Sequence, residues 1–166
     1  MDTKGPGFSY GTVFVSFVIL VLVAAVAYVF WPNEERVVRG RLNDIAAIMT
    51  VPANETDLAR MSRIAQLRNY LAPDLRVRYG SQDAVSRDAV LGALAQWGRS
   101  ADGVKVAFVD VQVTFDPAHA GAASAYLTAT ITGRDSVDAR EADVRLARIA
   151  DKWVVTGAET RETLTR

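Results

Sequence analysis

The feature that most constrains this chain is an apolar run from Gly11 to Trp31. Its 21 residues include no acidic or basic side chain, and Tyr28 is the only residue in it that can ionise. Because a helix rises about 1.5 Å per residue, the run would span about 30 Å, the thickness of the hydrocarbon core of a bilayer. We therefore expect residues 11–31 to form one membrane-spanning helix after a short tail, residues 1–10.

A cleaved signal peptide is the alternative interpretation of this run. Ala25, Val26 and Ala27 match the small-residue pattern at which signal peptides are cut. The run nevertheless stays apolar as far as Trp31, and aromatic residues lie near both of its ends, as they do at the two interfaces of a bilayer. These features favour an anchor that is retained.

The charges beside the run bear on its orientation. Lys4 precedes it, whereas Arg36, Arg39 and Arg41 follow it. Counting Lys and Arg alone favours a cytoplasmic domain, but long domains are translocated in spite of such charges. We expect the domain on the exported side of the membrane, periplasmic or extracellular, and the cytoplasmic side stays open as the alternative.

The composition excludes several classes of site. Nineteen basic and nineteen acidic residues give a net charge of zero, so no basic excess attracts nucleic acid. The chain has no cysteine, which rules out disulfides, thiolate metal sites and cysteine nucleophiles. His119 is the only histidine, so one chain cannot build a histidine-rich metal site. We expect neither a metal nor a cofactor.

Three segments have a helical pattern, and the first and the third are clear. In residues 34–49 apolar side chains recur at spacings of four and three, at Val38, Leu42, Ile45 and Met49. Residues 87–97 form the other pattern, which Ser86 is placed to cap and which puts Trp97 on the core side. Each pattern predicts a helix with one buried face.

The helix between them is expected to begin near Thr56 and to end at Pro73. Its apolar residues include Leu58 and Met61, which we expect to face the core, with Arg63 mostly on the opposite face. Proline ends a helix because it lacks a backbone N–H and clashes with the preceding turn.

Beyond Gly103 the period of the pattern changes from that of helix to that of strand. We expect a short strand at residues 74–79 and longer ones at residues 104–115, 124–133, 140–150 and 153–163. In the first long strand one face should carry Val109, Val111, Val113 and Phe115. A change of phase near Arg148 predicts a β-bulge, and Trp153 should lie in the core. Short links demand an antiparallel meander, and helices on one face of it give an α+β fold.

The order of these elements resembles the nuclear transport factor 2-like superfamily, which includes ketosteroid isomerases and small polyketide cyclases. The signatures are "LAPDLRVR" leading into "SRDAVLGAL", and the hairpin "IADKWVV". The resemblance covers residues 34–164 and implies one domain, residues 32–166. It would be a cone of three helices packed on a curved antiparallel sheet. The superfamily contains enzymes, ligand-binding proteins and interaction modules, so the fold does not choose a function.

In the enzymatic relatives a carboxylate or a histidine projects into the cone and moves a proton. The resemblance therefore makes Asp110, Tyr79 and His119 candidate catalytic residues. Each has a plainer interpretation. Asp110 alternates onto the polar face of its strand, His119 lies in a turn, and Tyr79 is a core residue with its hydroxyl at the rim. We expect no catalytic site, and an enzyme stays the less favoured alternative.

Two surface sets are candidates for binding. Arg76 and Arg78 project together from one strand and could hold an anionic group, although a balanced surface also explains them. A polar face of the sheet carries Gln112, Tyr126, Thr128 and Thr130, which we expect to bind a partner protein.

The anchor, the lack of an acid–base pair and the polar sheet face together favour a non-catalytic interaction module. We expect an accessory or assembly subunit of a larger membrane protein complex, with the lipid bilayer and other membrane subunits as partners and a homodimer through the sheet face as a further option. Two alternatives stay open: a binding protein for a lipid or other small apolar molecule, and an isomerase, dehydratase or cyclase.

The anchor can be tested by Leu20→Arg. An arginine at the centre of a spanning helix costs about 2.5–3.5 kcal/mol on the insertion scale, so we expect the variant to leave the membrane fraction. Intact-mass measurement of the purified protein should show that residues 11–31 are retained. A mature chain that begins near Tyr28 would contradict the anchor.

Overall fold

This computed structural model describes residues 19, 21, 33–80, 85–97, 102–134 and 136–161. The chain divides into two compact units, Met1–Asn33 and Glu34–Arg166. The expected membrane span lies outside the described residues, apart from Ile19 and Val21, which are helical. Among the described residues, no helix is both long and apolar enough to cross a membrane. The anchor stays a prediction from the sequence.

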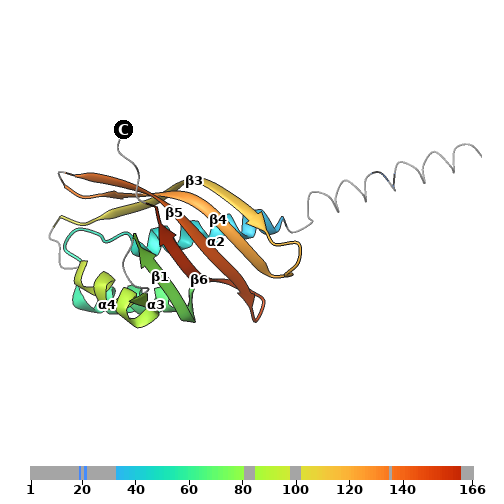
Figure 1. Ribbon diagram of the computed structural model, residues 1–166. Helices are drawn as coiled ribbons and strands as arrows, with labels where there is room; N and C mark the ends of the chain where they lie inside the picture. The colour runs from blue at the N-terminus through green and yellow to red at the C-terminus, as the bar shows by residue number, and fades with distance from the viewer. Residues whose placement is uncertain are drawn as a thin grey trace, which may run out of the picture. The chain divides into compact units, whose positions relative to one another are not determined.

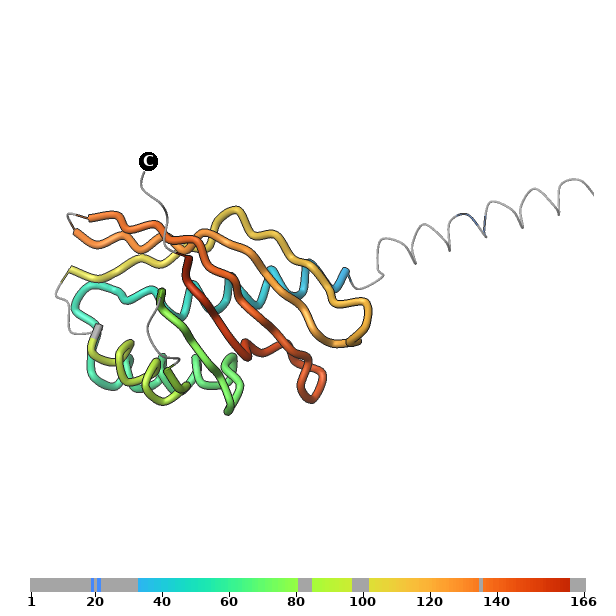
Figure 2. The backbone as a smooth tube through the Cα atoms, viewed as in Figure 1, coloured from blue at the N-terminus to red at the C-terminus, as the bar shows by residue number. Residues whose placement is uncertain are grey.

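The second unit is an α+β domain (Figure 1). Its described residues form the helices α2 (Glu34–Met49), α3 (Asp57–Arg68) and α4 (Arg87–Trp97). Its strands are β1 (Leu71–Tyr79), β2 (Val85–Ser86), β3 (Lys105–Phe115), β4 (Ala122–Thr132), β5 (Val137–Ile149) and β6 (Lys152–Thr160). They make one curved sheet in the order β2-β1-β6-β5-β4-β3, and the helices cover its inner face. Figure 2 shows α2, in cyan, running along β3.

One strand pair departs from the antiparallel sheet that the sequence predicted. β1 and β6 are parallel, with Leu71 opposite Val155 and Tyr79 opposite Thr160, whereas the other neighbouring pairs are antiparallel. A parallel pair needs a long connection. Here α4 and three strands of the meander supply it, so β6 returns beside β1 in the same direction.

The predicted pattern of β3 holds for Val111, Val113 and Phe115 and fails for Val109, because the strand contains a bulge. The register shifts between Val109 and Gln112, which places Asp110 and Val111 opposite one residue of β4. Asp110 has a φ of 54°, a left-handed conformation that aspartate tolerates better than most residues. Val109 is therefore 43% exposed instead of sharing a face with Val111. Before the bulge, Phe108 occupies the inner face in its place.

The bulge expected near Arg148 lies elsewhere. The register between β5 and β6 shifts between Arg145 and Leu146, where β6 has one more residue, Thr156, than its partner. The link between these strands is a tight turn at Ala150 and Asp151, both with positive φ. Such a turn matches the right-handed twist of the strands that it joins.

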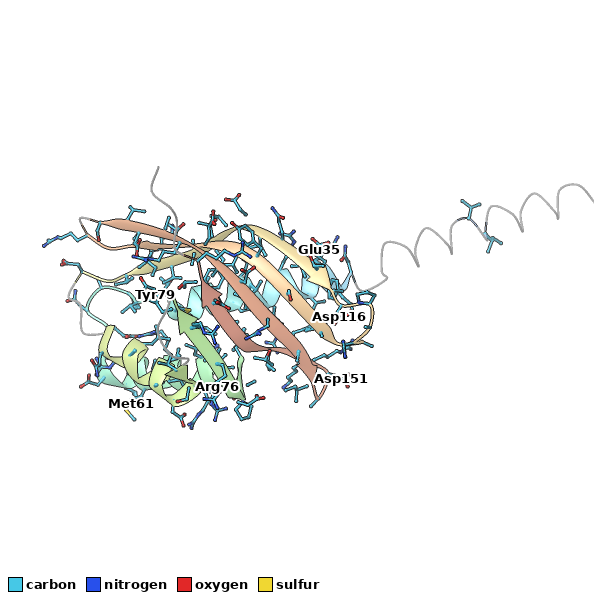
Figure 3. The ribbon with its side chains drawn as sticks, in the orientation of Figure 1. Glu35, Met61, Arg76, Tyr79, Asp116 and Asp151 are labelled. Atoms are coloured by element: carbon cyan, nitrogen blue, oxygen red, sulfur yellow. The ribbon has the colours of Figure 1, made fainter. Side chains whose placement is uncertain are left out.

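Helix α3 presents to the core a different face from the one expected. Leu58 and Met61 are 79% and 69% exposed, whereas Arg63 is buried; Figure 3 shows Met61 on the outer side of the helical layer. The guanidinium of Arg63 donates to both carboxylate oxygens of Glu55, at 2.8 and 2.9 Å. The Glu55 side chain is only 2% exposed. A paired and bonded charge can be buried, and hydrophobic periodicity alone does not reveal it.

The end of α3 also differs from the prediction. The helix stops at Arg68, and Leu71 already belongs to β1. Pro73 lies within that strand, between Leu71 and Arg76, where the register with β6 shifts. The neighbouring β2 pairs only with Arg76 and Val77, so it requires no N–H from Pro73.

The core lies between the helices and the inner face of the sheet. As predicted, Val38, Leu42 and Ile45 of α2 are buried. Trp153 is also buried, and its ring meets that of Phe115 edge-on at 5.9 Å between centroids. The side chain of Trp97 lies outside the description, so its place in the core stays a prediction.

The buried ion pair makes stability depend on pH. The hydrogen bond from Arg63 holds the pKa of Glu55 below its usual range. A lowered folded-state pKa gives stability that is present above the unfolded pKa and is lost as the pH falls through the folded value. Glu55→Gln should therefore lower the free energy of unfolding at pH 7, and its difference from wild type should shrink in strong acid. Urea unfolding at several pH values measures this.

Glu159→Gln is the matched control, because Glu159 pairs with Arg78 at 3.7 Å on an exposed surface. An exposed pair contributes about 0–1 kcal/mol, so we expect little effect at any pH. Equal effects of the two substitutions at pH 7 would contradict the importance of the buried pair.

Candidate functional site

One hollow of the domain, which we call the cone cavity, lies between the helices and the inner face of the sheet. Its volume is about 230 Å³. Helix α2 lines it with Leu42, Ile45 and Met49, and the strands contribute small residues, namely Ala129, Ala142 and Ala158. The strands supply alanines where larger side chains would fill the space.

The described walls of the cone cavity are apolar. Among the described residues that line it, Thr160 is the only polar one, and none of them is titratable. Apolar cavities of this kind stay dry and accept apolar molecules. Proton-transfer chemistry needs a titratable group held in the pocket with a partner that orients it. The described lining therefore suits binding by burial of apolar surface.

Polar side chains continue the inner face of the sheet beyond the cavity lining; we call Tyr79, Asp138, Arg140 and Thr160 the mouth of the cone. Thr160 pairs with Tyr79 on β1, and its Oγ1 accepts a hydrogen bond from the backbone of Gly80 at 3.3 Å. The guanidinium carbon of Arg140 lies 5.2 Å from the centroid of the Tyr79 ring. Figure 3 shows Tyr79 at the end of β1. The mouth thus places a cation–π pair beside an apolar cavity.

The three candidate catalytic residues do not come together. Tyr79 lies at the mouth and is 47% exposed, and Asp110 is exposed in the bulge of β3. Four strand spacings separate β1 from β3, roughly 19 Å along the sheet. His119 lies in the turn after β3, at the end of the sheet away from the mouth.

His119 instead belongs to a local turn with Asp116, which Figure 3 labels. Its Nδ1 lies 2.7 Å from Asp116 Oδ2, and the backbone of Ala118 donates to Asp116 Oδ1 at 2.8 Å. These two contacts, with the backbone bond from Ala118 the larger cause, hold the pKa of the Asp116 carboxyl below its usual range. Within the part of the chain that the structure describes, no three acidic or histidine side chains cluster as metal ligands would.

Arg76 and Arg78 lie on the outer face of the sheet, away from the helices. Val77 between them lines the cone cavity, so its neighbours point the other way. Arg78 is within 3.7 Å of Glu159, which faces it on β6. The carboxylate of Glu159 offsets part of the positive charge that would attract an anion. The anion site at Arg76 and Arg78 stays a prediction.

The residues expected to bind a partner form one patch on that outer face, which we call the outer patch: Gln112, Tyr126, Thr128 and Thr130. Gln112 pairs with Tyr126, and the two threonines follow on the same side of β4. A hydrogen bond to Glu141 raises the pKa of the Tyr126 hydroxyl. Arg161 lies over the Tyr126 ring at 5.6 Å and donates to Asp143 at 2.7 Å.

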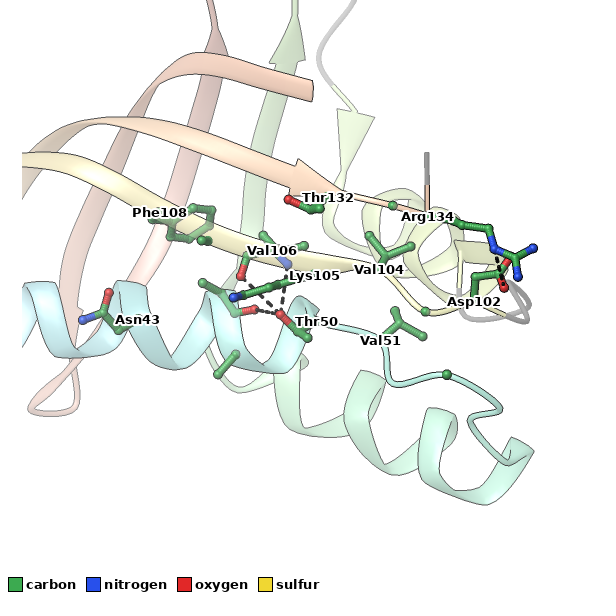
Figure 4. Close-up of a pocket in the computed structure, with 16 residues that line it drawn as sticks. Asn43, Thr50, Val51, Asp102, Val104, Lys105, Val106, Phe108, Thr132 and Arg134 are labelled. Carbon is green, nitrogen blue, oxygen red and sulfur yellow. Dashed lines mark hydrogen bonds and ion pairs between the residues drawn. The ribbon is translucent and has the colours of Figure 1, made fainter. Parts of the chain in front are cut away.

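A second hollow, of about 690 Å³, is an open groove between α2 and the first half of β3 (Figure 4). In this groove the hydroxyl of Thr50 accepts a hydrogen bond from the N–H of Val106 at 3.0 Å and donates one to its C=O at 3.2 Å. A side chain on Gly103 would meet the carbonyl oxygen of Val51 at 2.7 Å. The groove is therefore a junction where α2 is tied to the edge strand.

The sequence interpretation missed Arg140 as a residue of the mouth. The signal was present, because Arg140 precedes Ala142 by two positions and shares its side of β5. Thr160 was missed for a different reason: the bulge at Thr156 changes the alternation of β6 before it.

The chain matches no family model and none of the curated proteins. It is similar to solved structures. One is a putative scytalone dehydratase from Novosphingobium aromaticivorans, with a TM-score of 0.60 and 15% identity over 79% of this chain and 85% of that one. Another is an NTF2-like protein of unknown function from Pseudomonas aeruginosa, with a TM-score of 0.59 and 9% identity over 75% and 96%.

A third is an NTF2-like protein with a cystatin-like fold, also from Novosphingobium aromaticivorans. Its TM-score is 0.57 at 13% identity, and the match covers 89% of this chain and 92% of that one. Identities this low bear on the fold alone. Together these likenesses show that the domain has the nuclear transport factor 2-like fold, the α+β cone that its sequence resembles.

Proposed function

We propose that this domain is a binding domain, not an enzyme, and that it holds a small apolar molecule in its cone. The observation that carries the proposal is the cone cavity, because the described residues that line it are apolar except for Thr160. Burial of apolar surface contributes about 25 cal/mol per Å², and none of the described lining residues is charged.

The size of the cavity limits the ligand. An apolar cavity of about 150 Å³ takes one benzene ring. At about 230 Å³, the cone cavity suits a body of about two fused rings or a short aliphatic chain. A whole phospholipid tail is too large to be enclosed.

The enzymatic alternative has less support. One structural neighbour is named as a putative scytalone dehydratase, and a dehydratase in this cone would need an acid or a base in contact with its substrate. Asp110 and His119 are not among the residues that line the cavity. Tyr79 reaches only its mouth, where Arg140 covers its ring.

The predicted span, residues 11–31, would hold this binding domain at a bilayer. Apolar molecules concentrate in bilayers, so an anchored domain would meet its ligand where that ligand is most abundant. This arrangement keeps the lipid bilayer as a partner and the exported side as the expected location.

A second candidate is the interaction module, an accessory or assembly subunit that docks through its outer face. The observation that favours it is the outer patch, in which Gln112 pairs with Tyr126 beside Thr128. Tyrosine is enriched at protein interfaces. Anchoring would raise the effective concentration of the domain near other membrane subunits, or near a second copy of itself.

Binding in the cone can be tested on the full chain in phosphatidylcholine nanodiscs with methyl-labelled leucine. Added 2-naphthylmethanol, a neutral molecule of suitable size, should shift the methyl signals of Leu42 and Leu127, which line the cavity. It should leave the exposed Leu58 unchanged.

Ala129→Leu should abolish these shifts because it fills the cavity. Ala107→Leu is the matched control, since Ala107 pairs with Thr130 on the outer face. Absence of any shift in wild type, or equal binding to both variants, would contradict the proposal.

If the domain is an interaction module, its assembly with a partner should depend on the outer patch and not on the cone cavity. Tyr126→Ala combined with Thr128→Arg should remove a co-purifying membrane subunit, or a dimer seen by sedimentation, while the ligand-induced methyl shifts persist. Retention of the same assembly by this double variant would rule out docking through the outer patch.

A further inference from the structure

We infer that the outer face of the sheet carries a second binding site, in which Arg76 and Arg145 hold a phosphate monoester between them. This site lies on the opposite side of the sheet from the cone cavity. It therefore does not depend on whether the cone holds a ligand. Its ligand also differs in chemical class from the apolar molecule proposed for the cone.

The strand register brings the two arginines into one row across the sheet. Arg76 on β1 (Figure 3) and Arg145 on β5 both pair with Gly157 on β6, the strand between them. Val77 and Val144, their neighbours in sequence, line the cone cavity, so the two arginines face outward. Neighbouring strands lie about 4.8 Å apart, which puts the Cα atoms of the two arginines about 9.6 Å from each other.

Gly157 leaves the space between the two arginines without a side chain. The guanidinium of Arg145 lies over this glycine, because a Cβ on Gly157 would be 2.8 Å from Nη2 and 2.9 Å from Nε of Arg145. The guanidinium is thus turned along the row toward β1, the strand that carries Arg76. An anion held beside it is within reach of both arginine side chains.

Neither guanidinium forms an ion pair within the part of the chain that the structure describes. The acids of the neighbouring row are already engaged, since Glu159 lies 3.7 Å from Arg78 and Asp143 accepts a hydrogen bond from Arg161 at 2.7 Å. Asp74 is exposed on β1 and forms no ion pair with a described residue. The row therefore keeps two positive charges that no described carboxylate neutralises.

A phosphate monoester matches this arrangement in charge and in geometry. Two cations in one row repel each other, and an anion with two charges between them replaces that repulsion by attraction. A phosphate monoester carries about 1.5 to 2 negative charges at pH 7, and the planar guanidinium donates two parallel hydrogen bonds to phosphate oxygens. Ser86 pairs with Arg76 and Ser124 with Arg145, so a hydroxyl continues the row on either side.

The site can be tested on the full chain in phosphatidylcholine nanodiscs, through the NMR signals of the arginine Nε–H groups. Inorganic phosphate, exchanged against chloride at constant ionic strength, should shift the signals of Arg76 and Arg145 in a saturable way. Acetate carries one charge and should bind about tenfold more weakly, the change that one charge-assisted hydrogen bond produces.

Three variants separate a built site from diffuse attraction. Arg145→Gln should weaken phosphate binding about tenfold, as read from the Arg76 signal. Arg36→Gln is the matched control, because it removes the same charge from an exposed residue of α2, on the other side of the sheet, and it should bind phosphate as wild type does. Gly157→Ala keeps every charge but displaces the Arg145 guanidinium, so it should also weaken binding.

A phosphate monoester can belong to a lipid headgroup or to a soluble molecule. Nanodiscs that contain phosphatidic acid, with no phosphate added, distinguish these two sources. A shift of the Arg76 and Arg145 signals in such nanodiscs identifies a headgroup, whereas a shift with free phosphate alone identifies a soluble ligand. Either result supports the site.

Two results would overturn the inference. One is the absence of a saturable shift of the Arg76 and Arg145 signals in wild type. The other is equal weakening of phosphate binding by Arg145→Gln and Arg36→Gln, with no effect of Gly157→Ala. Both would leave the proposed function of the cone untouched, and the wild-type titration does not depend on whether any variant folds.

Discussion

The ion pair between Arg63 and Glu55 decides which face of α3 meets the cone. Arg63 reaches both the carboxylate and, at 3.4 Å, the carbonyl of Ile48 at the end of α2. This turns Leu67, one helical turn later, into the core, where it is 1% exposed and lines the cavity. Breaking such a pair would leave a buried charge without a partner, which costs far more than an exposed pair contributes.

Alternation along the sheet then separates two possible binding surfaces. On β4 the inner residues Leu127 and Ala129 line the cavity, while Tyr126 and Thr128, which alternate with them, face outward. A ligand in the cone and a protein on the outer patch would thus bind opposite faces of the same strand. The two proposed functions are therefore structurally compatible.

The sequence predicted the fold well wherever one period governed a segment, as in α2 and β4. It failed where a local feature interrupted the period: the left-handed Asp110 in β3 and the extra Thr156 in β6 each reverse the facing of later residues. It failed also at Arg63, because burial of a charge depends on a partner eight residues away that no periodicity marks. The site was the part predicted least well, because Arg140 and Tyr79 lie on strands that are far apart in the sequence and come close only in the folded sheet.

The cavity itself is an argument for a ligand. Each Å² of apolar wall that a ligand covers contributes about 25 cal/mol to its binding, and the described walls of the cone cavity are apolar. Alanines at 129, 142 and 158 maintain the space, although larger side chains at these positions would fill it. A molecule that occupies the cavity would cover these apolar walls, and the free energy gained would appear as affinity.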